Sequence, residues 1–275
     1  MDNFTTRKSA WEENKNICVN DFRFKHKIIP SIKYNYDDLN KNPIYDMSKG
    51  HSIAADGQLD KTYVYVLPKD TLECGLNLKN NGYNPVVLNM ADPCFAGGGV
   101  NMGCGAQEES LFYRTNYFQT LNNNTGFYPI SDASGIYSRD VFVIRDKDLK
   151  LINKHENISF IAVAAIKDPQ INNDSHFTND QSDLTKKKIE LIFQIAMKEN
   201  HDSIVVSALG CGAFHNPPND IIDIFNEAIK KYKYYFKLIT FAILPLSITG
   251  SRYMLKEDRK CNYELFKDKI STNIY

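Results

Sequence analysis

The chain lacks net charge and long apolar runs, and each absence excludes a class of protein. Its 275 residues include 33 Lys and Arg against 33 Asp and Glu, so the overall charge favours neither nucleic acid nor an anionic membrane. No apolar run is long enough to span a bilayer, and the start has no secretory leader. We therefore expect a soluble, intracellular protein that binds neither membranes nor nucleic acid directly.

The chain also lacks any C-x-x-C pair. Its six cysteines are scattered, which predicts reduced thiols and not a disulfide framework. They are Cys18, Cys74, Cys94, Cys104, Cys211 and Cys261. Those near glycine-rich segments have no spaced histidine partner, and His215 alone reads as a loop residue. We expect no metal site, no cofactor and no cysteine nucleophile.

Apolar residues make up 43% of the chain, enough for a sizeable core, and they fall into alternating strand and helix patterns. Strands are predicted at 62–67, 86–90, 141–145, 159–166, 203–209 and 238–244. Helices are predicted at 7–20, 71–81, 107–121, 184–200, 219–235 and near 255–270. Loops are predicted at 122–126 and 168–183. The alternation predicts α/β architecture.

No internal repeat or interdomain linker is visible, so residues 1–275 are interpreted as a single domain. Within it we distinguish an N-terminal accessory extension (1–60), a core (61–250) and a C-terminal helical tail (251–275). The stretch Lys25–Lys33 is basic with interleaved isoleucines. It is either a solvated layer or a rim that touches the substrate.

One glycine-rich segment organises the chain. Gly97, Gly98 and Gly99 follow the apolar strand 86–90, and Gln107-Glu108-Glu109 opens the next helix. Three glycines cost backbone entropy, which is offset where φ is positive or where a ligand approaches the backbone. Carboxylates in a first helical turn are favoured by the helix dipole. The spacing thus brings a ligand loop and two acids together.

A second glycine-rich loop, Gly210-Cys211-Gly212-Ala213-Phe214, follows the strand 203–209. Ligands of open α/β sheets bind at the carboxyl ends of the strands, and a glycine-rich turn there can direct N–H groups at phosphate. The loop has no Lys or Arg, so phosphate would be held by backbone dipoles. Its spacing matches neither a P-loop nor a dinucleotide fingerprint.

Together these motifs resemble the microbial-type poly(ADP-ribose) glycohydrolase family, whose members have the macrodomain fold. The resemblance extends from about Arg7 to about Leu244 and rests on the Gly-Gly-Gly…Gln-Glu-Glu signature and the Gly-Cys-Gly loop. It implies a macrodomain-like three-layer α/β/α sandwich with a mixed, mostly parallel sheet and an N-terminal helical extension. Both glycine loops should then lie at the same edge of the sheet.

The resemblance also implies a reaction: hydrolysis of ribose–ribose O-glycosidic bonds of poly(ADP-ribose), or action on ADP-ribosylated proteins, with ADP-ribose released. Carboxyl groups suit protonation of a leaving oxygen and stabilisation of an oxocarbenium-like centre. Glu109 is expected to be the catalytic acid/base, and Glu108 is expected to fix the ribose hydroxyls. Adjacent helical residues point in different directions, so distinct roles are physically natural.

The expected substrate-binding residues belong to the two loops and their flanks. They are Asp92, Gly97, Gly98, Gly99, Val100, Gln107, Gly210, Cys211, Gly212, Ala213 and Phe214. Gln107 is expected mainly to support the loop, and Phe214 to pack on the ribose. Two positions depart from the family pattern: Asp92 stands where Asn is usual, and Ala96 stands where proline is common.

Two alternatives to the polymer hydrolase stay open. One is a reader module that binds ADP-ribose without cleaving it, although a reader needs neither Glu108 nor Glu109. The other is a hydrolase of a free ADP-ribose derivative.

Overall fold

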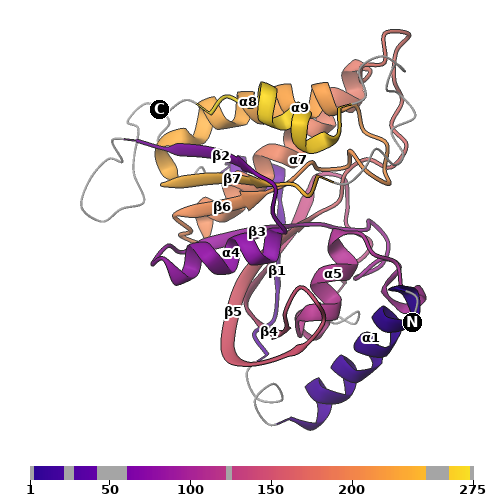
Figure 1. Cartoon of the computed structure of the whole chain (residues 1–275). Coiled ribbons are helices and arrows are strands. Elements are labelled where there is room, and N and C mark those ends of the chain that lie inside the picture. The colour runs from indigo at the N-terminus through magenta and orange to yellow at the C-terminus, as the bar shows by residue number, and fades with distance from the viewer. Residues whose placement is uncertain (1–2, 22–27, 42–60, 122–125, 246–259, 273–275) are drawn as a thin grey trace.

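The computed structural model describes residues 3–21, 28–41, 61–121, 126–245 and 260–272 (Figure 1). These residues form one seven-stranded sheet in the order β1-β4-β5-β3-β6-β7-β2. The strands are β1 (Ile32–Asn35), β2 (Tyr63–Leu67), β3 (Pro85–Met90), β4 (Ser134–Arg145), β5 (Leu151–Val163), β6 (Ser203–Val206) and β7 (Leu238–Ala242). The pairs from β5 through β3, β6 and β7 to β2 are parallel, whereas β1–β4 and β4–β5 are antiparallel. A mixed, mostly parallel sheet is confirmed.

Helices cover both faces of the sheet, which gives three layers (Figure 1). The helices of one layer are α1 (Asn3–Asn20), α4 (Thr71–Asn80), α5 (Gln107–Arg114) and α6 (Tyr117–Thr120). Those of the other are α7 (Asn179–Lys198), α8 (Pro218–Tyr232) and α9 (Asn262–Lys269). The short α3 (Tyr36–Lys41) follows β1. Central β3 is buried on both faces: Val86 and Leu88 face the α7–α8 layer, and Val87 faces the α4–α5 layer.

The predicted helix 107–121 is wrong in length. Helix α5 ends at Arg114, and a separate turn, α6, follows. The break occurs because Thr115 adopts an extended conformation and bridges Val143 of β4. Asn116 then exchanges hydrogen bonds with the backbone of Phe142. The edge of β4 therefore captures the chain where the helical pattern would continue.

Other boundaries also differ from the prediction. The strand predicted at 141–145 is part of β4, which begins at Ser134 because β4 and β5 form a long antiparallel hairpin. The predicted loop 168–183 is shorter, since α7 begins at Asn179. It is ordered by Asp220 of α8, which accepts hydrogen bonds from His176 and from the backbone N–H of Phe177. Residues 122–125 of the predicted loop and 246–259, part of the predicted tail helix, lie outside the described residues.

The two glycine-rich loops leave the same edge of the sheet. Strands β3 and β6 are parallel neighbours, with Val86 beside Ile204. The first glycine segment follows the carboxyl end of β3, and Gly210 follows that of β6. This placement confirms the predicted juxtaposition and sets the candidate site between them.

The N-terminal extension contributes to the core. β1 forms an edge of the sheet, and α1 packs against α5 and the first glycine segment. Trp11 of α1 lies 6.1 Å from Phe112 between ring centroids and donates a hydrogen bond from Nε1 to Asn101 Oδ1 at 2.7 Å. Asn14 donates to the carbonyls of Phe112 and Tyr113. Helix α1 thus supports the C-terminal half of α5 and Asn101, which follows the first glycine segment.

This contact predicts that Trp11→Ala destabilises the protein although Trp11 lies far from the candidate site in sequence. Removing a buried aromatic ring typically costs about 3–5 kcal/mol of unfolding free energy, and Trp11 is only 6% exposed. Urea unfolding measures the loss. Val19→Ala on the same helix is the matched control, since Val19 is 61% exposed. Equal stability of the two variants would contradict the buttressing role of α1.

Candidate active site

The first glycine segment closes directly onto the two glutamates of α5. Gly97 and Gly98 have φ of 82° and 49°, a left-handed conformation that other residues rarely adopt. A Cβ on Gly98 would lie 2.9 Å from Glu109 Oε1, and one on Gly97 would lie 2.6 Å from the Phe112 ring. Glycine is therefore required both by the backbone conformation and by the close approach of α5.

Glu109 is held by one oxygen only. Its Oε1 accepts a hydrogen bond from the backbone N–H of Gly99 at 2.9 Å. Its Oε2 has no hydrogen-bond partner among the described residues, although it is buried. Buried polar atoms are usually hydrogen-bonded, and exceptions occur at catalytic positions. One oriented carboxyl oxygen is thus left for another molecule.

Glu108 is held by both oxygens. Oε1 accepts from Asn89 Nδ2 at 3.1 Å, and Oε2 accepts from the backbone N–H of Asp92 at 2.8 Å. Burial raises its pKa to about 8, and the charge of Glu109 adds to the rise. Hydrogen bonds from the Asp92 and Gly97 backbones and from Asn89 partly offset it. Glu108 is therefore an anchored carboxyl whose pKa lies well above its usual range.

Asn89 is a site residue that the sequence interpretation missed. It lies on β3, is fully buried and orients Glu108. Its Oδ1 is buried without a partner among the described residues. A polar residue inside the apolar run 85–90 is the signal that could have identified it.

Three predicted binding residues have structural contacts of their own. Gln107 donates from Nε2 to Thr71 Oγ1 and to the Leu88 carbonyl, and it accepts the N–H of Met90. It thereby joins α5 to β3 and α4. Val100 is buried in the core.

Asp92 is the third predicted binding residue with structural contacts of its own. Its Oδ1 accepts the backbone N–H groups of Cys94 and Phe95 at 2.8 and 2.9 Å. The Asp92 carboxylate therefore closes a turn just before the glycines, while its own N–H supports Glu108.

The side chain of Asn216 holds the second glycine loop in place. This fully buried side chain donates from Nδ2 to the carbonyls of Ile166, Gly210 and Phe214. Gly210 has φ of 73°, and a Cβ there would lie 2.6 Å from the Asn216 amide. Cys211 is buried and its pKa is raised by burial, so its thiol is unreactive. The loop is rigid and preformed.

Gly212 differs from the other glycines of the two loops. Its φ is not left-handed, and a Cβ built on it would meet no atom within 4 Å. Neither backbone strain nor internal packing thus requires glycine at this position. The open space above it lies in a cleft, where a bound group can approach the backbone.

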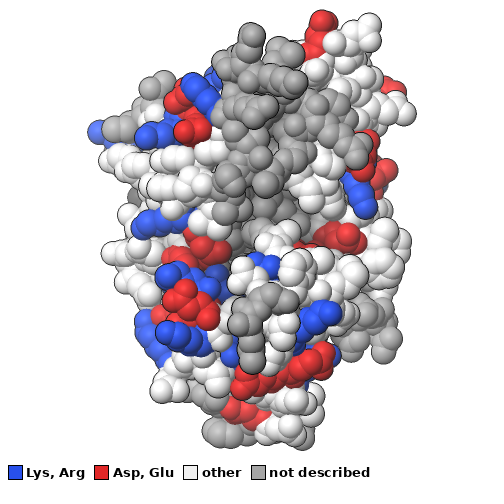
Figure 2. All heavy atoms as spheres, turned by 45° about the vertical axis from the view of Figure 1, so that its right-hand side comes forward, with Lys and Arg blue, Asp and Glu red and all other residues white. Residues whose placement is uncertain are grey.

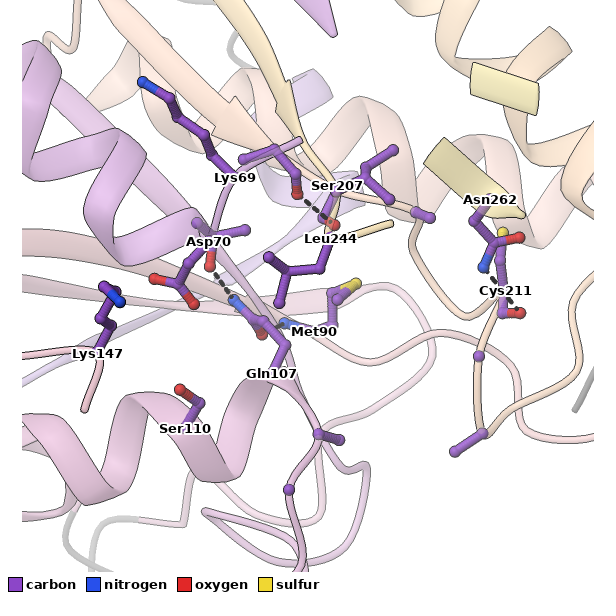
Figure 3. Close-up of a pocket in the computed structure, with 18 of the residues that line it drawn as sticks. Lys69, Asp70, Met90, Gln107, Ser110, Lys147, Ser207, Cys211, Leu244 and Asn262 are labelled. Carbon is purple, nitrogen blue, oxygen red and sulfur yellow. Dashed lines mark hydrogen bonds between the residues drawn. The ribbon is translucent and has the colours of Figure 1, made fainter. Parts of the chain in front are cut away.

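That cleft has a volume of about 900 Å³, at the upper end of the range of small-molecule sites, roughly 300–1,000 Å³. It runs along the carboxyl ends of the strands and includes all five residues of the second loop. In Figure 3, Cys211 and Asn262 lie on one side, Met90 and Gln107 in the middle, and Lys69 and Lys147 on the opposite side. Ser207, whose hydroxyl donates to the Ala242 carbonyl at 2.8 Å, lies above Met90 and Gln107 in this view.

The structure therefore arranges the predicted site residues in two adjoining groups. The second loop and Gln107 line the cleft. Asp92, the first glycine segment and the two glutamates do not line it; they form the carboxylate centre described above. Both groups meet at the edge where β3 and β6 end.

Comparisons with known proteins show which family the chain resembles. Residues 25–146 match the family model described as microbial-type PARG, catalytic domain, where PARG stands for poly(ADP-ribose) glycohydrolase. No match was found among curated protein sequences. The expected resemblance to the microbial-type PARG family is confirmed.

Solved PARG structures share the fold of the whole chain. The PARG of Thermomonospora curvata is 19% identical, with a TM-score of 0.77 over 96% of this chain and 99% of that one. The same enzyme bound to the inhibitor ADP-HPD gives a TM-score of 0.76 with the same coverage and identity. The PARG of Deinococcus radiodurans in complex with ADP-ribose is 18% identical, with a TM-score of 0.68 over 87% of this chain and 93% of that one. At these identities the likeness shows the macrodomain-like fold.

Metal-binding clusters and membrane-spanning helices are absent from the described part of the chain. Within it, no group of three or more His, Cys, Asp and Glu side chains is arranged to hold a metal ion. None of the described helices is both long and apolar enough to cross a membrane.

The raised pKa of Glu108 makes a prediction about stability. A carboxyl whose pKa rises from 4.5 to about 8 on folding binds a proton that the unfolded chain releases within that window. The free energy of unfolding therefore falls as pH rises from about 4.5 to 8, by an amount on the order of a few kcal/mol for this group. Glu108→Gln removes this dependence, so its stability relative to wild type should increase across the window.

Thermal and urea unfolding at pH 5, 7 and 9 check the expectation. Glu12→Gln is the control, because Glu12 is an exposed glutamate of α1. A stability difference between Glu108→Gln and wild type that stays constant from pH 5 to 9 would show that the buried carboxyl titrates normally.

Proposed function

We propose that this chain is a poly(ADP-ribose) glycohydrolase that hydrolyses ribose–ribose bonds and releases ADP-ribose. One observation carries the proposal. Beside a glycine-rich loop, two neighbouring buried carboxyls have unequal contacts: Glu108 is bonded through both oxygens, whereas Glu109 keeps Oε2 without a partner. A hydrolase needs such a free acid, and a reader does not. The family match and the shared fold support the same reaction.

In this proposal Glu109 performs the proton transfers. The Gly99 N–H fixes Oε1, which directs Oε2 toward the substrate. The carboxyl protonates the leaving 2′-oxygen of the adenosine ribose as the bond to C1″ breaks, and an oxocarbenium-like ribose develops. A water molecule then adds its hydroxyl to C1″ and returns its proton to Glu109, which regenerates the acid.

Glu108 positions the ribose that reacts. Each carboxyl oxygen accepts more than one hydrogen bond, so the contacts with Asn89 and Asp92 leave capacity for ribose hydroxyls. The Glu108 side chain is only 3% exposed, and both of its carboxyl oxygens accept hydrogen bonds. It therefore keeps its position when the ligand binds. The two glutamates therefore have separable tasks.

The diphosphate and the adenosine occupy the cleft. The backbone of the second loop faces the phosphates, and Gly212 lets them approach because no side chain lies between. The adenosine extends from there toward Gln107 and Met90, in the middle of the cleft (Figure 3). The second ribose then reaches the glutamates beside the first glycine segment.

Glu109→Gln should abolish polymer cleavage while ADP-ribose still binds. Gln keeps the size and the contact with Gly99 but cannot donate a proton of suitable acidity, and general acid catalysis contributes about a hundred- to ten-thousand-fold. Glu108→Gln should weaken binding and rate together, because it disturbs the positioning of the ribose. Release of ADP-ribose from purified polymer and calorimetric titration with ADP-ribose measure the two effects.

Near wild-type turnover by Glu109→Gln would place the acid elsewhere and refute this assignment. If the wild-type protein binds ADP-ribose but releases none from polymer, the chain is a reader and the proposed hydrolysis is wrong. ADP-ribosylated protein, tested beside free polymer, shows whether the enzyme also removes the unit attached to protein.

Gly212→Val tests the phosphate loop separately. The branched side chain would occupy the space that the phosphates need, so ADP-ribose affinity should fall by at least about tenfold, equivalent to about 1.4 kcal/mol. Because a Cβ at this position meets no protein atom, the thermal midpoint should be nearly unchanged. Gly212→Ala should lie between wild type and the valine variant. Unchanged affinity in both variants would mean that the loop is only a turn.

A further inference from the structure

The rim of the carboxylate centre presents an exposed aromatic ring that the proposed function does not use. Phe95 is 71% exposed, although it lies only two residues before the three glycines. Its backbone is held on both sides: Asp92 Oδ1 accepts the Phe95 N–H at 2.9 Å, and the Phe95 carbonyl accepts the Gly98 N–H at 3.0 Å. A fixed turn thus presents a large apolar side chain to solvent.

The same turn places Phe95 beside the two glutamates. A hydrogen-bonded turn between residues i and i+3 keeps their Cα atoms within about 7 Å of each other. At Gly98, a Cβ would lie 2.9 Å from Glu109 Oε1 and 3.3 Å from Glu108 Oε2. Because Phe95 is joined to Gly98 by this turn, its exposed ring belongs to the rim of the carboxylate centre.

This segment of the rim is apolar and carries no basic residue. Met102, which is 65% exposed, lies on the other side of the glycines, and its N–H bonds to the Gly99 carbonyl at 2.9 Å. Residues 91–106 include no Lys, Arg or His, and their one acidic side chain, Asp92, closes the turn. An aromatic ring without neighbouring cations suits a planar, uncharged group and offers little to a phosphate.

The proposed reaction brings one further group to this rim, which is the leaving group. In that reaction the unit that will be released fills the cleft, with its diphosphate at the second loop and its C1″ at Glu109. Neither Phe95 nor Met102 lines the cleft. The group on the other side of the broken bond cannot lie in the occupied cleft, so it extends over the first glycine segment toward these two side chains.

The chemistry of the leaving group decides what an aromatic ring can recognise there. When a ribose–ribose bond breaks, the leaving oxygen belongs to an adenosine ribose, and the adenine is attached to the neighbouring carbon of that sugar. Adenine is planar, aromatic and uncharged, and bases stack on aromatic side chains. When ADP-ribose is attached to an amino-acid side chain, by contrast, the leaving group has no base at this place.

We propose that Phe95 forms a leaving-group subsite that stacks the adenine of the departing unit, so that the enzyme prefers ribose–ribose bonds to bonds between ADP-ribose and protein. This inference rests on the proposed function. The bond that breaks and the proton transfers are unchanged: C1″ separates from the 2′-oxygen, Glu109 protonates that oxygen, and water supplies the hydroxyl to C1″ and a proton to Glu109.

Phe95→Ala tests the subsite with two substrates that differ in their leaving group. Its kcat/KM for polymer should fall about five- to a hundredfold, the loss expected for one stacked base. Release of ADP-ribose from a mono-ADP-ribosylated protein should not change. Phe95→Trp should keep polymer cleavage, whereas Phe95→Leu should not, because leucine is apolar but has no aromatic face. Since the side chain is 71% exposed, the thermal midpoint of each variant should stay near that of wild type.

A binding measurement separates this inference from the hydrolase proposal. In a Glu109→Gln background, an oligomer of two ADP-ribose units can fill the cleft and the rim together, whereas ADP-ribose fills only the cleft. Phe95→Ala should lower the affinity for the oligomer about five- to a hundredfold and leave the affinity for ADP-ribose unchanged. Tyr65→Ala is the control, because Tyr65 is a 46% exposed aromatic residue on β2, at the edge of the sheet.

Three results would refute the subsite. They are wild-type cleavage of polymer by Phe95→Ala, equal losses of affinity for the oligomer and for ADP-ribose, and full retention of activity by Phe95→Leu. Equal losses would mean that Phe95 serves the unit in the cleft, and retention by leucine would mean that no base stacks on the ring. If wild type cleaves nothing, the hydrolase proposal fails, and the ratio of the two affinities still decides whether the subsite exists.

Discussion

The hydrogen bond from the Gly99 N–H to Glu109 Oε1 is the interaction on which the site depends. It ties the first glycine segment to the first turn of α5 and leaves the other carboxyl oxygen free. The bond is possible only because Gly97 and Gly98 adopt left-handed conformations and have no Cβ between the loop and the helix. A side chain at any of these positions would push the loop away from the carboxyls and release Glu109. The three glycines therefore fix the orientation of the Glu109 carboxyl as well as making room for a ligand.

This contact requires a rigid α5, but a helix this short is not stable by itself. An eight-residue helix is marginal in isolation, and this one buries two carboxyls in its first turn. Stability comes from outside the helix. Arg114 at its end pairs with Asp70 and Glu73, and α1 packs on it through Trp11 and Asn14. The N-terminal extension thus belongs functionally to the active site.

The sequence predicted the features that depend on local spacing. The glycine segment, the two carboxylates nine and ten positions beyond Gly99 and the second loop all follow strands whose apolar pattern is clear, so their meeting at one edge could be inferred. The end of α5 at Arg114 could not be inferred from the sequence, because Thr115 forms a bridge with Val143, which lies far along the chain. The support from α1 is equally non-local, since Trp11 and Phe112 meet only in three dimensions. Different contacts for Glu108 and Glu109 emerge only once burial and the position of Asn89 are known.

The distribution of charge explains how a neutral protein can recognise a polyanion. In the proposed function, backbone dipoles of the second loop would hold phosphate without side-chain charge, so this subsite would gain little from nonspecific attraction and much from geometry. On the face in Figure 2, where acids and bases alternate, nucleic acid would meet no continuous cationic surface. On this proposal, selectivity for one polyanion over another would follow from the shape of the cleft and the backbone groups that line it, and not from the total number of charges.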